Sequence, residues 1–577
     1  MSSRSALSSI IRVGLLLLCY ANTAHIPIRG VPSSNISVKL KTGTLEGVFS
    51  EAYDQDFFLG VPYAKPPVGD LRFRRPQRAD AWEGVRAAHE YGSWCYGVSI
   101  RLAGFSQNNT GPMSEDCLTL NIVRPAHTPG KAKLPVAVWI HGGGYSEGGS
   151  ADQRYNGSFL VQESVQMGNG IIFVSFNYRL GIFGLMAGPV LEQTGDTNIA
   201  IHDQRMALTW IQENISKFGG DPDHVTIFGE SAGAASVGFH LIAHGGRDSG
   251  LFHAAIAHSG GPYSYNAFTN ATQRRQEFQN TLGHANCTAA TDALACLRSV
   301  PAAALNGLNS FVTPYPILDG DLVEDYSSKL LAKGAFRKVP LLIGTNRNEG
   351  SAFLRLFRPT GVTTETDFFS FIQEHNPGQT LPQAMLRSWS DEYKDEIFDN
   401  SIGGLGTISA NPGPGYGAFY GKSTLWIGDL LFTAGRRFTN QMWSKHGVPS
   451  YSYLFDTVPA NLDPAIAGSA HFSDVCFAFG NLEGLGYSVS PLGTSGSPQN
   501  EVLRRLAKHM SRMWISFFVH KTPNHHGIPN VVHWPTYSIT NATNIVLSAV
   551  SGDYTTPDTW REKALQTFID LAPTLRR

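Results

Sequence analysis

Residues 225–238 constrain this chain more than any other stretch, because they join a short apolar run to a G-x-S-x-G motif. Residues 225–228 are β-branched or aromatic and predict a strand, and the small and apolar residues after the motif, up to 242, predict a helix. The two glycines of the motif let the strand and helix approach each other around a tight turn. The motif alone is a weak signal, but its flanking elements make Ser231 a candidate nucleophile.

A serine is a weak nucleophile until a histidine takes its proton and a carboxylate orients that histidine. In one established arrangement of a serine on such a turn, both partners follow it in the chain, the acid first. Glu349 follows the apolar run at 339–344, and His471 lies among small residues after the run at 450–455. A lone glutamate in a polar turn is more often a solvated charge, and any one of 19 histidines is more often structural. Chain order and position nevertheless favour these two side chains.

Three glycines at 142–144 follow an apolar run that ends at His141. Because they lack side chains, their backbone N–H groups can approach a substrate oxygen and stabilise the anion formed when a carbonyl is attacked. The N–H of Ala232, at the start of the predicted helix, is a further candidate donor. A plain flexible loop is the alternative for the glycines, whereas a phosphate cradle is excluded because no helix with a P-loop lysine follows.

The pattern of apolar runs predicts the fold class. Runs at 134–141 and 170–178 are nearly continuous, as in strands buried on both faces of a sheet, and residues 203–218 carry apolar residues at helical spacing before two glycines. Further strands are expected at residues 38–48 (as a hairpin), 57–63, 254–258, 339–344 and 450–455. Strands alternating with helices predict an α/β fold with a large, mostly parallel central sheet and helices on both faces. No composition break divides residues 25–577, so we expect a single domain.

Residues 1–24 have the pattern of a secretory signal peptide, with Arg4 and Arg12 before the apolar run 13–20 and alanines at 21 and 24. That run is too short to span a membrane, which takes about 20 residues, and no later segment is apolar enough. We therefore expect a secreted, extracellular protein without an integral membrane segment. The net charge of -1 and the absence of long basic runs give no support for nucleic-acid binding.

Cysteines and glycosylation signals fit an oxidising, extracellular compartment. The close pairs Cys95/Cys117 and Cys287/Cys296 suggest two local disulfides, and Cys476 is left free once the signal, with its one cysteine, is removed. Sequons for N-glycosylation, which also arise by chance, begin at Asn35, Asn108, Asn156, Asn214, Asn270, Asn286 and Asn541.

A set of motifs covers nearly the whole mature chain. They are G-V-P-Y-A at 60–64, L-R-F at 71–73, E-D-C-L at 115–118, H-G-G-G at 141–144, residues 198–204, F-G-G-D-P at 218–222, the serine turn, and Trp534-Pro535. Together they resemble the type-B carboxylesterases and lipases, the cholinesterase-like branch of the α/β hydrolases, and most of all their secreted fungal members. The resemblance implies the α/β-hydrolase fold.

The same resemblance implies roles for individual residues. Ser231 matches the family's nucleophile, His471 its general base and Glu349 its acid. The matching oxyanion donors and disulfides are Gly143, Gly144 and Ala232, and Cys95–Cys117 and Cys287–Cys296. Such an enzyme cleaves an ester through an acyl-enzyme and needs no metal or organic cofactor.

Three further residues match the family's pattern near these groups. Arg72 and Glu115 match an ion pair that stabilises the fold, and we assign them to stability. Glu230, beside the serine, matches a carboxylate near the active-site histidine, with an electrostatic role or a purely structural hydrogen bond.

The substrate is less well defined by the sequence. The segment between Cys95 and Cys117 resembles the loop that forms a lid in large lipases, but it is short. We therefore expect soluble, short-to-medium acyl esters, with triacylglycerol lipase activity as the alternative. The segment contains no tryptophan, whereas cholinesterases place a cation-binding tryptophan there, so choline esters are disfavoured.

Two further interpretations of the sequence are less favoured. Phe353, Phe357 and Trp426 are candidates for an acyl pocket, although core packing is the more common role of each. A non-catalytic adhesion protein of the same fold is disfavoured, because the serine, glutamate, histidine and glycine loop are all intact. The sequence does not reveal an oligomeric state.

Overall fold

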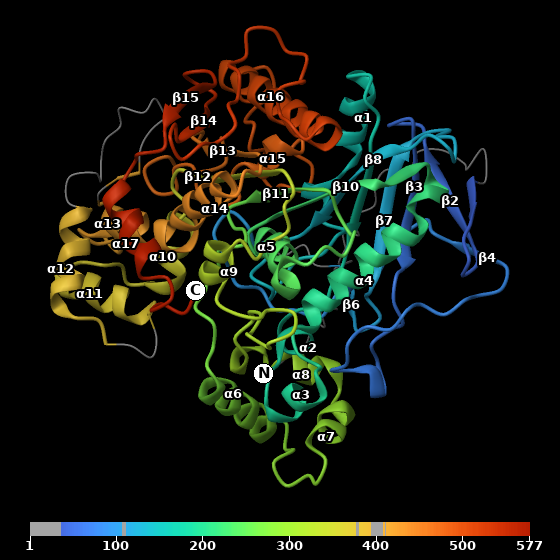
Figure 1. Cartoon of the computed structure of the whole chain (residues 1–577), viewed down its shortest axis with the longest axis horizontal. Coiled ribbons are helices and arrows are strands. Elements are labelled where there is room, and N and C mark those ends of the chain that lie inside the picture. The colour runs from blue at the N-terminus through green and yellow to red at the C-terminus, as the bar shows by residue number, and fades with distance from the viewer. Residues whose placement is uncertain (1–35, 107–110, 377–379, 394–407, 410) are drawn as a thin grey trace, which may run out of the picture.

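The computed structural model describes residues 36–106, 111–376, 380–393, 408–409 and 411–577 (Figure 1). The strands are β1 (Ile36–Lys39), β2 (Thr44–Ser50), β3 (Gln55–Pro62), β4 (Val85–Ala87), β5 (Trp94–Cys95), β6 (Met113–Ser114), β7 (Thr119–Pro125), β8 (Leu134–Ile140), β9 (Ile172–Phe176), β10 (Gly220–Glu230), β11 (Ala254–His258), β12 (Leu341–Asn346), β13 (Ser450–Phe455), β14 (Thr543–Leu547) and β15 (Tyr554–Pro557). The predicted signal peptide lies outside the described residues.

Seventeen α-helices are described. They are α1 (Ser158–Gln166), α2 (Gly181–Leu185), α3 (Pro189–Thr194), α4 (Ile199–Asn214), α5 (Ala232–Gly246), α6 (Ala271–His284), α7 (Ala293–Ser299), α8 (Ala302–Asn306), α9 (Ser327–Lys333), α10 (Ser351–Phe357), α11 (Glu365–Glu374), α12 (Gln383–Glu392), α13 (Tyr420–Gly428), α14 (Ala434–Lys445), α15 (Val475–Ala478), α16 (Pro498–His520) and α17 (Glu562–Asp570). Within the described ranges, none of them is both long and apolar enough to cross a membrane.

One large sheet organises the described chain. Its strand order is β1-β2-β3-β7-β9-β8-β10-β11-β12-β13-β14-β15, with β4 beside β2. The seven consecutive strands β9-β8-β10-β11-β12-β13-β14 run parallel to one another. The pairs outside them are antiparallel, apart from the parallel β2–β4 pair. In a parallel sheet the carboxyl ends of the strands share one edge, where functional side chains collect. The predicted mostly parallel α/β architecture is confirmed.

Strand β8 shows why the centre of the sheet is apolar on both faces. Val136, Val138 and Ile140 enter one hydrophobic core, and Ala137 and Trp139 enter a second core on the opposite face. Helices α4, α5 and α14 cover the first face, and α1 and α16 cover the second. The period-two alternation therefore buries residues 136–140 on both faces, which is the pattern predicted from the continuous hydrophobicity of the run.

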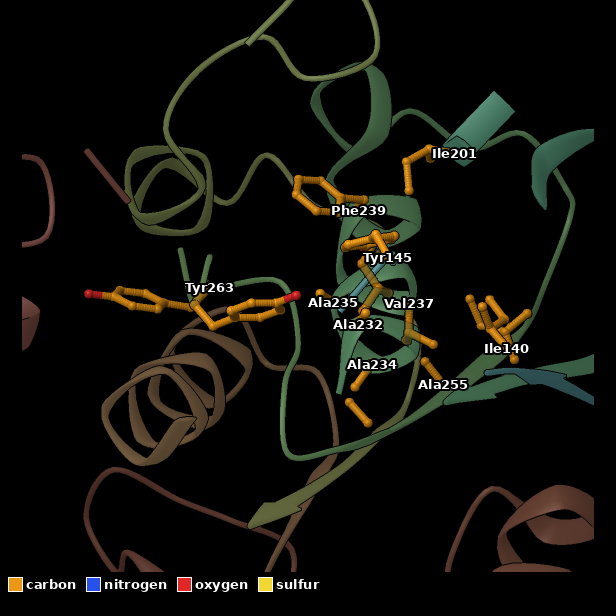
Figure 2. Packing of buried hydrophobic residues seen from close by; sticks show 14 of the residues in the cluster. Ile140, Tyr145, Ile201, Ala232, Ala234, Ala235, Val237, Phe239, Ala255 and Tyr263 are labelled. Carbon is orange, nitrogen blue, oxygen red and sulfur yellow. The ribbon is translucent and has the colours of Figure 1, made fainter. Parts of the chain in front are cut away.

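Helix α5 packs directly on the middle of the sheet. Residues 232–243 are all buried, as expected of a helix that is apolar on every side. Ala234 and Val237 lie on the side of the helix towards Ala255 of the sheet, and Ala235 lies on the side of Tyr263 (Figure 2). Small side chains bring the start of this helix close to the strand ends.

Most predicted elements occur with shifted ends. The predicted hairpin is formed by β1 and β2. Strand β10 begins at Gly220 and not at Val225, with a register shift between these residues against β8. The helix expected at 203–218 is α4 followed by a 3-10 turn (Ile215–Phe218), which Gly219 ends in the left-handed region at φ 87°.

Candidate active site

Ser231 occupies the turn between β10 and α5. Its backbone has φ 57° and ψ -121°, an uncommon conformation for a residue with a side chain. A Cβ at Gly233 would lie 2.0 Å from the carbonyl oxygen of Ile140, and one at Gly229 would lie 2.6 Å from the carbonyl carbon of Gly233. Only glycine fits at both positions, so the motif follows from the close packing of the turn.

The structure brings Glu349 and His471 into contact. Glu349 lies in the turn after β12, and His471 lies in the segment before α15. His471 Nδ1 is 2.5 Å from Glu349 Oε2, and both side chains are almost fully buried. Because a carboxylate accepts hydrogen bonds, this contact places the proton on Nδ1 and leaves Nε2 free to accept one.

Two neighbours hold the Glu349 carboxylate. Its Oε1 accepts hydrogen bonds from the Ser259 hydroxyl at 2.5 Å and from the backbone N–H of Asn346 at 2.7 Å. Ser259 follows β11 directly, and Asn346 is the last residue of β12. The sequence analysis missed both, although the rule that singled out Glu349, a polar residue at the carboxyl end of a central strand, applies to them equally.

A second buried histidine and carboxylate lie beside this pair. Asp474 Oδ2 accepts hydrogen bonds from His258 Nδ1 at 2.8 Å and from Tyr453 at 2.7 Å. Its Oδ1 is 3.3 Å from Nδ2 of Asn346, whose backbone holds Glu349. A hydrogen-bonded path therefore connects the second pair to the acid beside His471.

Glu230 faces the other nitrogen of His471. Its Oε1 lies 3.1 Å from His471 Nε2, and both side chains are inaccessible to solvent. Burial raises the pKa of Glu230 to about 8. Burial lowers the pKa of His471, but the carboxylates of Glu230 and Glu349 raise it more, so the net shift is upward from 6.5. Of the two roles left open by the sequence, the geometry favours the electrostatic one.

Ser231 directly follows Glu230, the residue whose carboxylate faces Nε2 of His471. Within the described residues, Nε2 of His471 makes no hydrogen bond, so the serine hydroxyl is not yet engaged. Such contacts are often long in enzymes without substrate and tighten when it binds. Ser231 is 8% exposed, which gives its hydroxyl limited access.

Aromatic rings enclose His471. The ring of Phe432 stacks on the imidazole at 4.6 Å between centroids, and Phe353 lies at 4.9 Å. Phe432 belongs to a π-helical turn (Asp429–Thr433) between α13 and α14, a local widening that is frequent at functional sites. Of the candidate pocket aromatics, Phe357 stacks on Phe353, whereas Trp426 is fully buried in the core.

The glycine loop lies against Ser231. A Cβ at Gly142 would be 3.2 Å from the Cβ of Ser231, and Gly143 and Gly144 have φ values of 99° and 61°. The N–H groups of Gly143, Gly144 and Ala232 have no hydrogen-bond acceptor in the described part of the chain. They are therefore available to an oxygen bound next to the serine.

In the described ranges, no group of three or more His, Cys, Asp or Glu side chains is arranged to hold a metal ion.

Comparison with known proteins identifies the family. The Carboxylesterase family model matches residues 34–566. This chain belongs to the carboxylesterase family. It is 38% identical to Lipase 1 of Geotrichum candidum over 56% of this chain, an alignment that spans only 63% of that lipase. It is 35% identical to Secreted lipase 1 of Botryotinia fuckeliana over 74% of this chain and 77% of that lipase.

A solved structure supports the same assignment. The crystal structure of Aspergillus niger EstA matches with a TM-score of 0.79 and 29% identity, and the alignment covers 95% of this chain and 100% of EstA. The resemblance seen in the sequence motifs and the predicted α/β-hydrolase fold are therefore confirmed.

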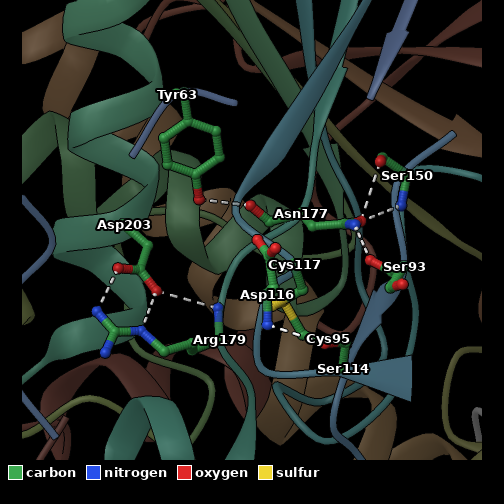
Figure 3. The surroundings of a disulfide bond; sticks show 10 residues. All are labelled: Tyr63, Ser93, Cys95, Ser114, Asp116, Cys117, Ser150, Asn177, Arg179 and Asp203. Atoms are coloured by element: carbon green, nitrogen blue, oxygen red, sulfur yellow. Dashed lines mark hydrogen bonds and ion pairs between the residues drawn. A yellow bond between two sulfur atoms is a disulfide. The ribbon is translucent and has the colours of Figure 1, made fainter. Parts of the chain in front are cut away.

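Both predicted disulfides of this carboxylesterase-family chain are present. Cys95–Cys117 closes a span of 22 residues and Cys287–Cys296 one of 9, and Cys476 is free and buried. Figure 3 shows the first disulfide among the polar contacts that fasten its loop. Burial raises the pKa of the Cys476 thiol, which keeps it protonated and unreactive.

Arg72 and Glu115 form the expected ion pair. The guanidinium donates from Nε and Nη2 to the two carboxylate oxygens, each at 2.6 Å. Its Nη1 also donates to backbone carbonyls at Leu297, Arg298 and Val300. These contacts join the N-terminal segment to the end of α7, which fits a role in stability.

The sequons differ in accessibility. Asn270, Asn286 and Asn541 are exposed and Asn214 is half-buried, whereas Asn156 is 3% exposed. The amide oxygen of Asn156 accepts the backbone N–H of Ser158 at 3.0 Å. A glycan does not fit at Asn156 in the folded chain. Asn35 and Asn108 lie outside the described residues.

Proposed function

We propose that this chain hydrolyses carboxylic esters through an acyl-enzyme, with Ser231 as nucleophile, His471 as general base and Glu349 as the orienting acid. The observation that carries the proposal is the 2.5 Å contact between His471 Nδ1 and Glu349 Oε2, next to the residue that precedes Ser231. Membership of the carboxylesterase family and the serine turn support it independently.

In the first step, Nε2 of His471 takes the proton of the Ser231 hydroxyl while Oγ forms a bond to the ester carbonyl carbon. Glu349 balances the charge of the imidazolium and keeps its ring in place. The tetrahedral intermediate collapses when His471 returns the proton to the leaving alcohol. Water then repeats the attack on the acyl-enzyme, and the acid is released together with free Ser231.

The oxyanion is the charge that this site has to stabilise. We assign its hydrogen bonds to the backbone N–H groups of Gly143, Gly144 and Ala232, which have no acceptor of their own in the described chain. The N-terminus of α5 adds its favourable dipole. Backbone donors held in place by the fold need little rearrangement during the reaction.

An active-site label tests the assignment of the nucleophile. The purified protein should hydrolyse 4-nitrophenyl butyrate and bind one equivalent of a fluorophosphonate, detected by intact mass. Ser231→Ala should lose both, with an unchanged urea unfolding curve as the control. Continued stoichiometric labelling of the variant would assign the nucleophile to another residue.

For substrate class we propose soluble, short-to-medium acyl esters. The short Cys95–Cys117 span supports this, because a short loop covers less of the site than a large lipase lid. The second candidate is a triacylglycerol lipase, favoured by the lipase names of two relatives. Rates on tributyrin below and above its solubility limit separate the two, since a lipase gains activity when the emulsion forms.

We also propose that residues 25–577 form one secreted domain released from a signal peptide at residues 1–24. The composition of these first residues and a relative named as a secreted lipase support the proposal. N-terminal sequencing of protein from the medium of a eukaryotic host should begin near residue 25. Full-length protein retained in the cells would count against it.

A further inference from the structure

Glu147 joins the glycine loop to the disulfide loop. Its carboxylate is buried, and Oε1 accepts the backbone N–H of Ile100 at 3.2 Å and the hydroxyl of Ser106. Ile100 and Ser106 both belong to the Cys95–Cys117 loop, at the two ends of one short segment. One carboxylate therefore fixes both ends of that segment.

The same residue is part of the turn that presents the oxyanion donors. The backbone N–H groups of Ser146 and Glu147 donate to the carbonyl of Gly143 at 2.9 and 3.0 Å. A Cβ at Gly143 would lie 3.1 Å from the Cγ of Glu147 and 2.2 Å from its carbonyl oxygen. The side chain that holds the disulfide loop is thus packed on the backbone of an oxyanion glycine.

Ile100 of the disulfide loop lies close to Gly144. Its Cδ1 lies 3.4 Å from the position that a Cβ on Gly144 would occupy. Its Cγ2 lies 3.8 Å from the same position, and the residue as a whole is only partly buried. An apolar group at that point limits the volume open to a substrate bound to the Gly144 N–H.

Other contacts hold the loop in the same place. Asn177, after β9, donates to the carbonyl of Ser93 at 2.9 Å and accepts the backbone N–H of Ser150 at 2.8 Å (Figure 3). Arg154 donates to the carbonyl of Phe105 at 2.7 Å. These contacts hold the chain at Ser93, before the Ile100 segment, and at Phe105, within it. Glu147 bonds to Ile100 itself.

We propose that Glu147 is a positioning residue that fixes Ile100 beside Gly144, and that Ile100 sets an upper limit on the size of the ester group accepted there. The inference rests on the proposed ester hydrolysis and adds the residues that determine its size selectivity. Because the loop is held in place, one side chain, Ile100, and the residue that anchors it, Glu147, determine the selectivity for ester size.

Ile100→Ala tests the size limit directly. We compare kcat/KM for 4-nitrophenyl acetate with that for 4-nitrophenyl benzoate, and phenyl acetate with 1-naphthyl acetate. In Ile100→Ala, kcat/KM for the bulky ester divided by kcat/KM for the small ester should rise about tenfold in at least one of the two pairs. Ile100→Phe should lower the same ratio. Val98→Ala is the matched control, because this loop residue is 37% exposed and should leave both ratios unchanged.

Glu147 variants test the anchor. Glu147→Ala should raise the same ratio as Ile100→Ala, because the loop segment loses its acceptor, whereas Glu147→Gln keeps an acceptor oxygen and should retain the wild-type ratio. Urea unfolding identifies any variant that fails to fold, and the Ile100 variants then still decide the size limit. Wild-type-like ratios in both Ile100→Ala and Glu147→Ala, in active enzymes, would overturn the inference. Absence of hydrolysis of every ester by the wild type would instead refute the proposed function.

Discussion

His258 and Asp474 share a hydrogen bond of 2.8 Å between Nδ1 and Oδ2, and neither side chain is exposed. Trp514 donates its Nε1–H to Nε2 of His258 at 2.9 Å, so that nitrogen is an acceptor and the imidazole is neutral with its proton on Nδ1. Burial raises the pKa of Asp474, but its contacts with His258 and neighbouring donors lower it more. The buried Asp474 carboxylate is therefore stabilised by its contacts with His258, Tyr453 and Asn346.

Asp474→Ala should destabilise the fold strongly. The substitution leaves the Nδ1–H of His258 and the hydroxyl of Tyr453 buried without an acceptor, at a cost of about 1–3 kcal/mol each. We expect a loss of about 3 kcal/mol or more in the free energy of unfolding, measured in urea. Asp80→Ala is the control: its ion pair with Lys65 is 75% exposed on the aspartate side, and the change should be within about 0.5 kcal/mol. Equal losses in the two variants would contradict this account.

The raised pKa of His471 predicts where activity is lost in acid. The base must be neutral to accept the serine proton, so kcat/KM is low below its pKa and reaches its full value above it. The midpoint of this limb should lie above 6.5. Glu230 and His471 share one proton across their 3.1 Å contact, and Glu230→Gln should move the midpoint to lower pH because it removes the ionised form of Glu230, which favours the imidazolium. The measurement is kcat/KM from pH 5 to 9 in a chemistry-limited assay. Glu213→Gln, at an exposed ion pair with Arg78, is the control, and an unmoved midpoint in Glu230→Gln would refute the electrostatic role.

The sequence predicted the residues that follow strands. Ser231, Glu349 and His471 lie after strands β10, β12 and β13, and parallel strands deliver such residues to one edge. The serine motif, together with the chain order and position of the other two residues, was therefore enough to name them as candidates. The contact between Glu349 and His471 agrees with that prediction. Roles in catalysis are a separate matter, decided by the labelling experiment.

The supporting network could not be predicted in the same way. The His258–Asp474 contact spans 216 positions in the chain, and no local pattern encodes it. Trp514 lies in the long amphipathic helix α16, where its apolar ring predicts core packing and its N–H gives no signal. Glu147 in a glycine-rich loop looks like a solvated charge. In each case the role of the side chain depends on which segment, distant in the sequence, folds next to it.

Gly143→Ala should reduce turnover without unfolding the protein. The new Cβ would lie 2.2 Å from the carbonyl oxygen of Glu147, and φ of 99° strains any residue other than glycine, so the N–H moves out of place. Loss of one oxyanion donor lowers kcat by about 10²–10³-fold. Gly168→Ala is the matched control, since this glycine also has a positive φ of 73° but nothing within 4 Å of its Cβ position. It should cost about 1 kcal/mol of stability and leave kcat unchanged. Comparable kcat values for the two variants would show that the Gly143 N–H is not an oxyanion donor.

Accessibility predicts which sequons carry glycans in active protein. Asn270, Asn286 and Asn541 are exposed, so a glycan added at any of them stays in solvent after folding. At Asn156 the glycan would be joined to Nδ2 of a 3% exposed side chain and would have to replace the packing around it, so a chain modified there cannot reach this fold. We therefore expect folded, secreted protein to be unmodified at Asn156. Peptide mass spectrometry after enzymatic deglycosylation measures this, because each former glycan site is converted from asparagine to aspartate. Aspartate at 156 in active enzyme would mean that this segment is more open in solution than its hydrogen bonds indicate.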